Sequence, residues 1–410
     1  MRPNEALLLA LVAGLCLYHL PRRQRRPISD LDLAVGSFTV GGVAVAFLVL
    51  FLSDSAALLS QDTIREVLSP AQFLVVYLVF SRTEFSSRGL HAILNLTMLA
   101  SVLVGLVAIA ELVDLHVREL MAAYYAAPAR PPGWDPVYRP TSTIGHYSAV
   151  GAFGALNYTL ALSLATMRHP AFSGAWLSLV MAVNLAAVVA SLTWAPLVVL
   201  PLVTGMVLWY GRRLPRELGM TALALGAAFV LLWPSVGARI AEQGVSPSAG
   251  QALTIPQTFD TRLRHWEEFF LPALADHAWL GTGTVIPSQV PTALTDFVDN
   301  EYIREGFRAG ILGVTLLLIM LITIAVVGWR SRASPDSTRR SLGGACLALV
   351  VFFALVGMTA EYLFFGGVSQ EFAMMIGLLG ASRPVEARAP MRSPVGTSLP
   401  LAGAGARLSG

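Results

Sequence analysis

The sequence predicts an all-α, polytopic membrane protein with about eleven transmembrane helices, and its composition and hydropathy pattern carry that prediction. Of the 410 residues, 55% are apolar and only 13% are charged, and the mean hydropathy is +0.65. Soluble globular domains carry about 25% charged residues, so this chain has too few to cover its surface in water. The composition therefore excludes a soluble enzyme, a DNA-binding protein and a disordered protein.

Apolar runs predict the individual helices, because a segment in lipid must satisfy its backbone hydrogen bonds internally. The runs are 6–20, 31–52, 68–81, 90–113, 146–166, 173–192, 197–210, 218–234, 309–328, 342–360 and 367–381. We keep the first run as a helix of the mature protein, since it lacks the basic leader and the cleavage site of a signal peptide.

The placement of arginine predicts the orientation of these helices. All 28 basic residues are arginine, which is typical of a GC-rich bacterial genome. Arginine clusters follow every second run, and cytoplasmic loops are enriched in basic residues. We therefore expect a bacterial cytoplasmic (inner) membrane, with the N-terminus outside and the C-terminus in the cytoplasm. The clusters are Arg22–Arg26, Arg82 with Arg88, Arg168, Arg212–Arg216, Arg330–Arg340 and Arg383–Arg407.

One transmembrane domain is expected over residues 1–381, with long outer loops at about 114–145 and 235–308. Loops of this length are usually functional or disordered. In the second loop, Asp260–Leu274 has apolar residues at helical spacing, which predicts an amphipathic helix at the membrane surface. Residues 382–410 are rich in Pro, Gly, Ser and Arg, so we expect a disordered cytoplasmic tail.

The sequence lacks the motifs of nucleotide and metal chemistry. It has no Walker A sequence, no HExxH and no Cys/His cluster, and its two cysteines, Cys16 and Cys346, lie inside apolar runs. The segment Gly281–Gly283 lacks the helix of a dinucleotide fingerprint and is interpreted as a turn. We therefore expect no cofactor, no metal ion and no nucleic-acid partner.

Three polar segments lie at the predicted outer boundary of the membrane. Arginine side chains bind phosphate oxygens bidentately, and a nearby carboxylate accepts a proton from a hydroxyl group. Together they indicate a site for a lipid diphosphate and a hydroxyl acceptor. The candidate residues are Arg139 and His146 in RPTSTIGHY, Arg262, Arg264 and Trp266 in TRLRHW, and Asp299, Asn300, Tyr302 and Arg304 in VDNEYIREG.

Structural interpretations of the same residues stay open. Outer arginines also pair with lipid headgroups or with local acids. Asp299 precedes an apolar helix and has the position of an N-cap. Glu301 with Arg304, and Glu305 with Arg308, have the spacing of stabilising pairs on one helix face.

Four polar residues fall inside the predicted helices, where they are costly if they face lipid. We expect Asn95, Glu111, Asn184 and Glu371 to face the bundle, with Glu111 and Glu371 solvated near the helix ends. His146, where a helix begins, has the position of a satisfied polar end as well as that of a base.

The polar segments together resemble the O-antigen ligase / O-antigen polymerase superfamily of bacterial membrane glycosyltransferases. Arg139–Phe153 is similar to the family's arginine segment that opens a helix, and Thr261–Gly283 to its R-x-x-x-W segment with a glycine turn. Val298–Gly313 is similar to its HN-x-Y-L segment. The order and spacing of the three segments match, and the large outer loop lies between the corresponding helices.

The resemblance implies a fold related to the C-type glycosyltransferases and a polyprenyl-diphosphate-linked saccharide as donor, without nucleotide or metal. It implies that Arg262 and Arg139 bind the donor diphosphate and stabilise its charge as it leaves. Asp299 stands where ligases have histidine, which favours a polysaccharide polymerase over a ligase and assigns Asp299 to the acceptor hydroxyl. The other candidates are assigned to substrate binding: Arg264, His146, Trp266, Asn300, Tyr302 and Arg304.

The resemblance also implies the partners of the protein. These are the lipid-linked donor, a saccharide or lipid-linked acceptor, membrane lipids and other polysaccharide-export proteins. The amphipathic segment would then cover the entry of the lipid, and His146 is an alternative base.

Two other functional classes stay open. A lipid-linked saccharide flippase or another transporter often has two similar halves and broken helices, but the sequence shows no internal repeat. A scaffold of a cell-envelope complex would tolerate the loss of Arg262. The long outer loops with clustered arginine favour an enzyme.

Overall fold

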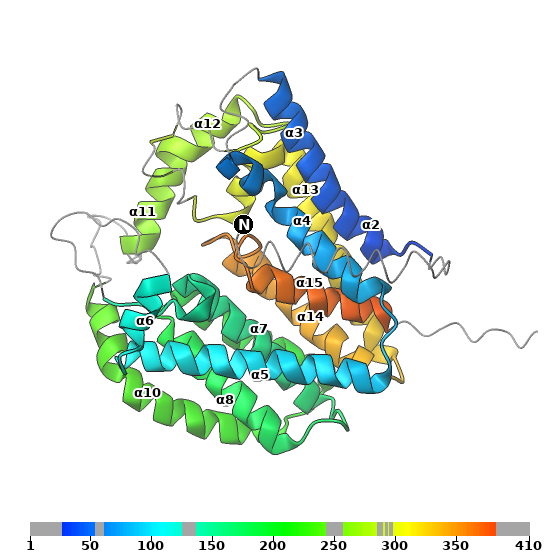
Figure 1. The fold of residues 1–410 in the computed structure, drawn as a ribbon, viewed down its shortest axis with the longest axis vertical. Helices are drawn as coiled ribbons and strands as arrows, with labels where there is room; N and C mark the ends of the chain where they lie inside the picture. Colours follow the sequence, from blue (N-terminus) through cyan, green and yellow to red (C-terminus); the bar gives the residue numbers. More distant parts are fainter. Residues whose placement is uncertain are drawn as a thin grey trace, which may run out of the picture.

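The computed structural model describes residues 27–53, 61–124, 137–242, 257–284, 290–291, 294 and 298–382 (Figure 1). Over these ranges the secondary structure is helical, without strands. Seven helices in the described part are long and apolar enough to cross a membrane, as expected of a polytopic all-α membrane protein. The helix predicted at 6–20 and, beyond Ser382, the predicted tail lie outside the described residues.

Every predicted apolar run from 31–52 onward falls on a helix. The candidate spans are α2 (Asp30–Gly36) continued through the π-helical turn η1 (Ser37–Gly41) into α3 (Gly42–Leu52), α5 (Ser87–Leu112), α7 (Tyr147–Thr166), α9 (Trp194–Gly211), α10 (Arg216–Glu242), α13 (Glu301–Arg330) and α14 (Ser337–Val356). Two apolar helices, α8 (Gly174–Ala190) and α15 (Val368–Ala381), are shorter. Helix α4 (Gln61–Arg82) begins with polar turns and is not among the seven candidate spans.

The two predicted outer loops contain helices of their own. The first includes α6 (Val117–Tyr124) and the 3-10 turn η3 (Ser142–Ile144), which the sequence did not predict. The second begins later than predicted, because α10 continues to Glu242. It includes α11 (Gln257–His265), the π-helical turn η4 (Trp266–Phe270) and α12 (Leu271–Ala275), so the segment predicted as an amphipathic helix is helical.

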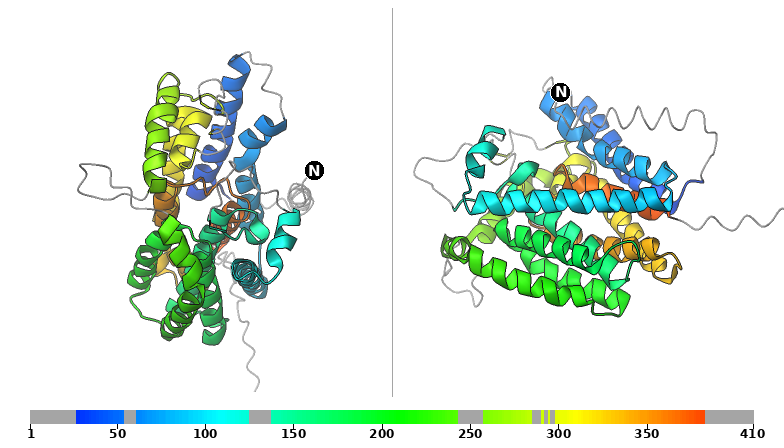
Figure 2. Two further views of the ribbon diagram at one scale, coloured as in Figure 1. Left: turned by 90° about the vertical axis from the view of Figure 1, so that its left-hand side faces the viewer. Right: turned by 60° about the horizontal axis from the view of Figure 1, so that its bottom comes forward.

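Two groups of helices enclose α14 and α15 (Figures 1 and 2). On one side lie α2, α3, α4 and α13, and on the other lie α5, α7, α8 and α10. The apolar window of α7 is 94% buried, whereas that of α10 is 17% buried. Helix α8 approaches α7 closely at Gly154, where a Cβ atom would lie 2.8 Å from the carbonyl oxygen of Asn184. α7 is therefore central, and α10 has an outward apolar face suited to lipid.

The arginine-rich junctions meet at one end of the bundle, because consecutive helices run in opposite directions. Arg332, before α14, lies over the rings of Trp209 and Tyr210 at the end of α9. His169, between α7 and α8, hydrogen-bonds to Thr338 at the start of α14 (2.9 Å). The candidate site lies at the opposite end, where α5, α8, α10 and α14 end and α7, α13 and α15 begin.

Polar residues inside the helices mostly face the bundle, as predicted. Asn184 is buried and donates to the Ser101 hydroxyl (2.9 Å), and Asn157 donates to buried Glu371 (2.9 Å). The expectation that Glu371 is solvated near a helix end is therefore wrong. Asn95 is exposed on the outer face of α5, so the prediction for this residue is wrong as well.

Helix α13 is interrupted at Gly310, which has φ 62° and ψ −157°. At the break, the carbonyl oxygen of Phe307 accepts a hydrogen bond from the backbone N–H of Thr282 (2.7 Å). The backbone N–H of Ile311 donates to the carbonyl oxygen of Ala278 (2.7 Å). The interruption thus attaches the segment after α12 to α13 through backbone groups that a continuous helix would use internally.

Replacing Gly310 with alanine is expected to destabilise the protein by about 2–6 kcal/mol. A Cβ atom there would lie 2.2 Å from the carbonyl oxygen of Trp279, and the positive φ adds strain. The measurement is thermal unfolding of the purified protein in detergent. Gly205→Ala in α9 is the matched control, because no atom lies within 4 Å of its added Cβ. Equal midpoints for the two variants would contradict the close packing at the break.

Candidate functional site

The start of α13 forms the centre of the candidate site. The side-chain oxygen of Asn300 accepts hydrogen bonds from the backbone N–H groups of Tyr302 (2.9 Å) and Ile303 (3.1 Å). Asn300 is therefore the N-cap, and the capping role considered for Asp299 is wrong. Asp299 has φ 50°, and its side chain is directed to a partner outside the helix.

Arg262 and Asp299 form an ion pair. The Nε atom of Arg262 donates to a carboxylate oxygen of Asp299 at 2.9 Å, and the two side chains are 30% and 34% exposed. Trp266, in the same segment, donates from its indole nitrogen to the carbonyl oxygen of Val298 (2.9 Å). The segment of α11 and η4 is thus attached to the residues that precede α13, and two predicted catalytic residues are in contact.

Arg139 lies in the segment before α7 and contacts uncharged groups. Its guanidinium donates to the Thr193 hydroxyl (2.7 Å) and to the carbonyl oxygen of Ser191 (3.4 Å). The same group lies 3.3 Å from the centre of the Tyr147 ring, a cation–π contact. These contacts fix the guanidinium without neutralising its charge.

The positive charges of two other arginines, Arg239 and Arg262, act on Arg139 at this end of the bundle. Burial lowers the pKa of Arg139 to about 10, and the charges of Arg239 and Arg262 contribute to the shift. A pKa in this range leaves Arg139 charged at neutral pH. The structure therefore brings the two predicted arginines into one electrostatic environment and adds Arg239, which the sequence did not predict.

Glu111 holds the segment that carries Arg139. Its carboxylate accepts hydrogen bonds from the backbone N–H groups of Thr141 (3.0 Å) and Ser142 (2.7 Å) and from the Tyr138 hydroxyl. The expectation that Glu111 is solvated is wrong, since it is fully buried. Protein donors replace water around this carboxylate, as a buried charge requires.

His146 caps α7 and is held between aromatic rings. Its Nδ1 atom accepts from the backbone N–H of Ser148 (3.2 Å), and its ring stacks on Tyr147 and Phe365 with centroids 4.4 Å and 4.5 Å away. Burial, and then the charge of Arg139, lowers the pKa of His146 to about 4. The imidazole is therefore neutral at physiological pH and a weak base, which disfavours it as the alternative base.

Replacing His146 with phenylalanine is expected to flatten the dependence of stability on pH. Between pH 7 and pH 4 the unfolded chain gains a proton at this imidazole and the folded chain does not, so acidification destabilises the folded state. The phenylalanine ring keeps the stacking. The free energy of unfolding of the variant is expected to fall by about 3 kcal/mol less than that of the wild type between pH 7 and pH 4. Unfolding midpoints across that pH range give the slope. His116→Asn, at an exposed histidine, is the control, and equal slopes for His146→Phe and wild type would contradict the prediction.

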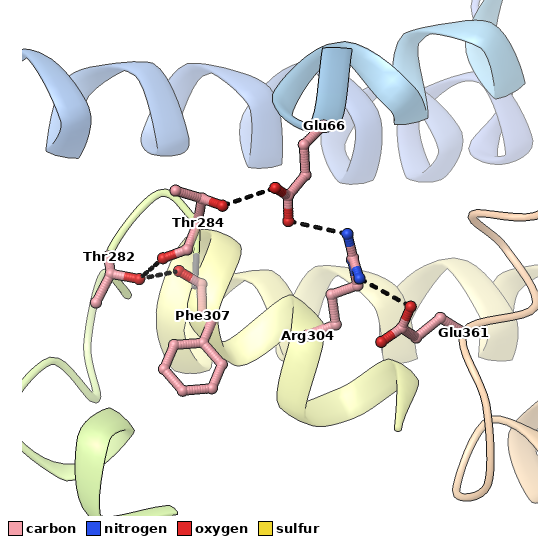
Figure 3. Close-up of polar contacts among 6 residues, drawn as sticks. All are labelled: Glu66, Thr282, Thr284, Arg304, Phe307 and Glu361. Atoms are coloured by element: carbon pink, nitrogen blue, oxygen red, sulfur yellow. Dashed lines mark hydrogen bonds and ion pairs between the residues drawn. The ribbon is translucent and has the colours of Figure 1, made fainter. Parts of the chain in front are cut away.

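Arg304 forms ion pairs with two acids from other parts of the chain (Figure 3). Its Nη1 atom donates to Glu361 (2.8 Å), and its Nη2 atom donates to Glu66 (2.9 Å). The Thr284 hydroxyl donates to the other oxygen of Glu66 (2.8 Å). The network joins α4, the segment after α12, α13 and the loop between α14 and α15. The expected pair of Arg304 with Glu301 is absent from these contacts. The predicted role of Arg304 in substrate binding stays a prediction.

The other predicted binding residues also contact the protein. Arg264 pairs with Asp260 (2.5 Å) on the exposed face of α11, and the Tyr302 hydroxyl donates to the carbonyl oxygen of Ala354 (2.7 Å). Their contacts with a substrate, like those of Asn300, stay predictions.

Sequence reasoning missed the acids that hold Arg304. Burial raises the pKa of Glu361 to about 7. The negative charges of Asp299 and Glu66 also raise this pKa, whereas the positive charge of Arg304 lowers it. The signal in the sequence was a carboxylate directly after the apolar run 342–360, where an unpaired charge would be costly. Glu361 extends the polar groups of the site from Asp299 into the protein.

No protein-family model matches this chain, and no curated protein matches its sequence. The site presents charged guanidinium groups beside a carboxylate, partly exposed, at one end of an apolar helix bundle. Such a set binds an anionic group and accepts a proton.

Proposed function

We propose that the protein is a glycosyltransferase that polymerises polyprenyl-diphosphate-linked saccharides at the outer face of the bacterial cytoplasmic membrane. The observation that carries this proposal is the contact between Arg262 and Asp299, with the charge of Arg139 close by. Transfer from a lipid diphosphate needs cations for the leaving group and an acceptor for the hydroxyl proton. These residues supply both.

The proposed reaction is a single displacement at the anomeric carbon of the donor. The acceptor hydroxyl oxygen forms the new glycosidic bond as the bond from the anomeric carbon to the diphosphate oxygen breaks. The diphosphate leaves with the bonding electron pair, and Arg262 and Arg139 stabilise its charge. The hydroxyl proton passes to Asp299, and the configuration at the anomeric carbon is inverted.

The ion pair supports an order of events in which the donor prepares the site. While Arg262 holds Asp299, each neutralises the other. A diphosphate competes for Arg262 and releases the carboxylate of Asp299 toward the acceptor. Both side chains are about one-third exposed, so a ligand can reach them.

The finer topology belongs to the same proposal. We infer eleven spans, with the N-terminus outside, the C-terminus in the cytoplasm and a fold related to the C-type glycosyltransferases. The seven candidate spans, the apolar helices α8 and α15 and the arginine-rich end opposite the site support this topology. An aspartate at position 299, where ligases have histidine, favours a polymerase, and the acceptor would then be a second lipid-linked saccharide.

A transporter of lipid-linked saccharides is the second candidate, because α13 combines a break with buried charges. Glu305 and Arg308 pair at 2.5 Å and are 0% and 3% exposed, close to the break at Gly310. Broken helices and intramembrane ionisable residues are typical of transport pathways. We prefer the enzyme because this pair is closed to ligands, whereas Arg262 and Asp299 are accessible.

The chain-length profile of the host's surface polysaccharide tests the proposal. Deletion of the gene is expected to leave single repeat units, and the wild-type gene is expected to restore long chains. Long chains that persist on the lipid carrier would instead indicate a ligase. A loss of repeat units from the outer face would indicate the transporter.

A further inference from the structure

A third arginine, Arg239, lies near the segment that carries Arg139, one of the two arginines that the proposed function assigns to the diphosphate. It belongs to the last turn of α10, and its side chain is only 11% exposed. Val236, three residues earlier on the same helix face, is buried in a cluster that includes Val137 and Leu112. This packing directs that face of α10 toward the segment that carries Arg139.

Hydrogen bonds attach the end of α10 to the same segment. Arg239 pairs with Glu242, and the other carboxylate oxygen of Glu242 accepts from the backbone N–H of Val137 (3.3 Å). Val137 is two residues before Arg139. Figures 1 and 2 show the end of α10 and the start of α11, the helix of Arg262, on the same side of the molecule.

The polar groups around Arg239 are incompletely satisfied. Its Nε atom is buried and has no hydrogen-bond partner among the described residues. Arg139 bonds to uncharged oxygens, while the charges of Arg239 and Arg262 act on it. Of the partners described, Glu242 and Asp299 are the acids that pair with these three guanidinium groups. A surplus of positive charge at a largely buried place is stabilised by a bound anion.

We propose that Arg239 is the third guanidinium of a diphosphate site, together with Arg139 and Arg262. This inference rests on the proposed function, which supplies the diphosphate. A diphosphate presents several anionic oxygens, and each guanidinium can bind two of them through its planar fork. The free Nε–H of Arg239 is a donor for such an oxygen. Because Arg239 belongs to α10 and Arg262 to α11, the bound diphosphate links these two helices.

Binding of polyprenyl diphosphate to the full-length protein in detergent micelles tests this inference. Arg239→Ala is expected to weaken binding by about tenfold or more, the cost of one charge-assisted hydrogen bond. Glu242→Gln is the matched variant, because the amide oxygen still accepts from Val137 while the competing charge is gone. Its affinity is expected to equal or exceed that of the wild type. Arg213→Ala removes an exposed arginine at the opposite end and is expected to have no effect.

Equal losses of affinity in Arg239→Ala and Glu242→Gln would show that the pair only fastens α10, and would overturn the inference. If Arg239→Ala fails to fold, Arg239→Lys keeps the charge but loses the fork. It is expected to bind more weakly than the wild type, and unchanged affinity would overturn the inference. Phosphatidylglycerol that displaces the probe equally well would mark a phospholipid headgroup site instead. A wild type that binds no probe would contradict the proposed function itself.

Discussion

Replacing Arg262 with alanine is expected to lower the rate of saccharide polymerisation by about 10²–10³-fold. The variant removes a cation that stabilises the leaving diphosphate, and it leaves Asp299 without the partner that holds it at 2.9 Å. The rate is measured with the purified protein in liposomes that contain the lipid-linked saccharide. Arg213→Ala, at the arginine-rich end, is the matched control, and polymerisation at the wild-type rate by Arg262→Ala would contradict the site.

Asp299→Asn separates the two roles of the pair. The asparagine no longer competes for Arg262 as an anion, so the donor diphosphate is expected to bind more tightly than to the wild type. Turnover is nevertheless expected to fall, because the amide accepts no proton from the acceptor hydroxyl. Weaker donor binding together with normal turnover would show that Asp299 only positions Arg262.

Replacing Arg304 with alanine is expected to destabilise the fold by about 3–5 kcal/mol. Arg304 is 16% exposed and forms ion pairs with both Glu66 and Glu361 (Figure 3). Its loss therefore leaves both carboxylates without the cation that they share. Four separate parts of the chain meet at this network, including the segment attached to the break in α13. Thermal or denaturant unfolding in detergent measures the loss.

A second substitution shows whether the loss is electrostatic. Arg304→Ala with Glu361→Gln removes the cation together with the more buried of its two acids, and is expected to recover part of the stability. Burial already raises the pKa of Glu361 to about 7, so its neutral form is accessible near physiological pH. A double variant as unstable as Arg304→Ala would show that the arginine acts through packing alone.

The helices were predictable because lipid imposes one rule on every spanning segment: apolar side chains and internal backbone hydrogen bonds. The break in α13 could not be predicted from the sequence. Gly310 lies in an apolar run that reads as continuous helix, and the interruption is compensated by Thr282 and Ala278 from a distant segment. Hydropathy carries no information about such a compensation.

The contact between Arg262 and Asp299 joins two segments that the sequence analysis predicted as parts of the site from their polar residues. The environment of the other candidates depends on partners far along the chain. Arg304 reads as an accessible cation until Glu66, 238 residues away, is placed beside it. Arg239 has the position of an ordinary basic residue in a last helical turn, and its relation to Arg139 depends on tertiary contacts such as the hydrogen bond from Val137 to Glu242.

The most direct measurement follows two products at once, in liposomes that contain the purified protein and a polyprenyl-diphosphate-linked saccharide as the sole substrate. The proposed function predicts that the saccharide lengthens, and that one free polyprenyl diphosphate appears for each glycosidic bond formed. Movement of the intact lipid-linked saccharide across the bilayer, without lengthening and without free polyprenyl diphosphate, would contradict it and identify a transporter.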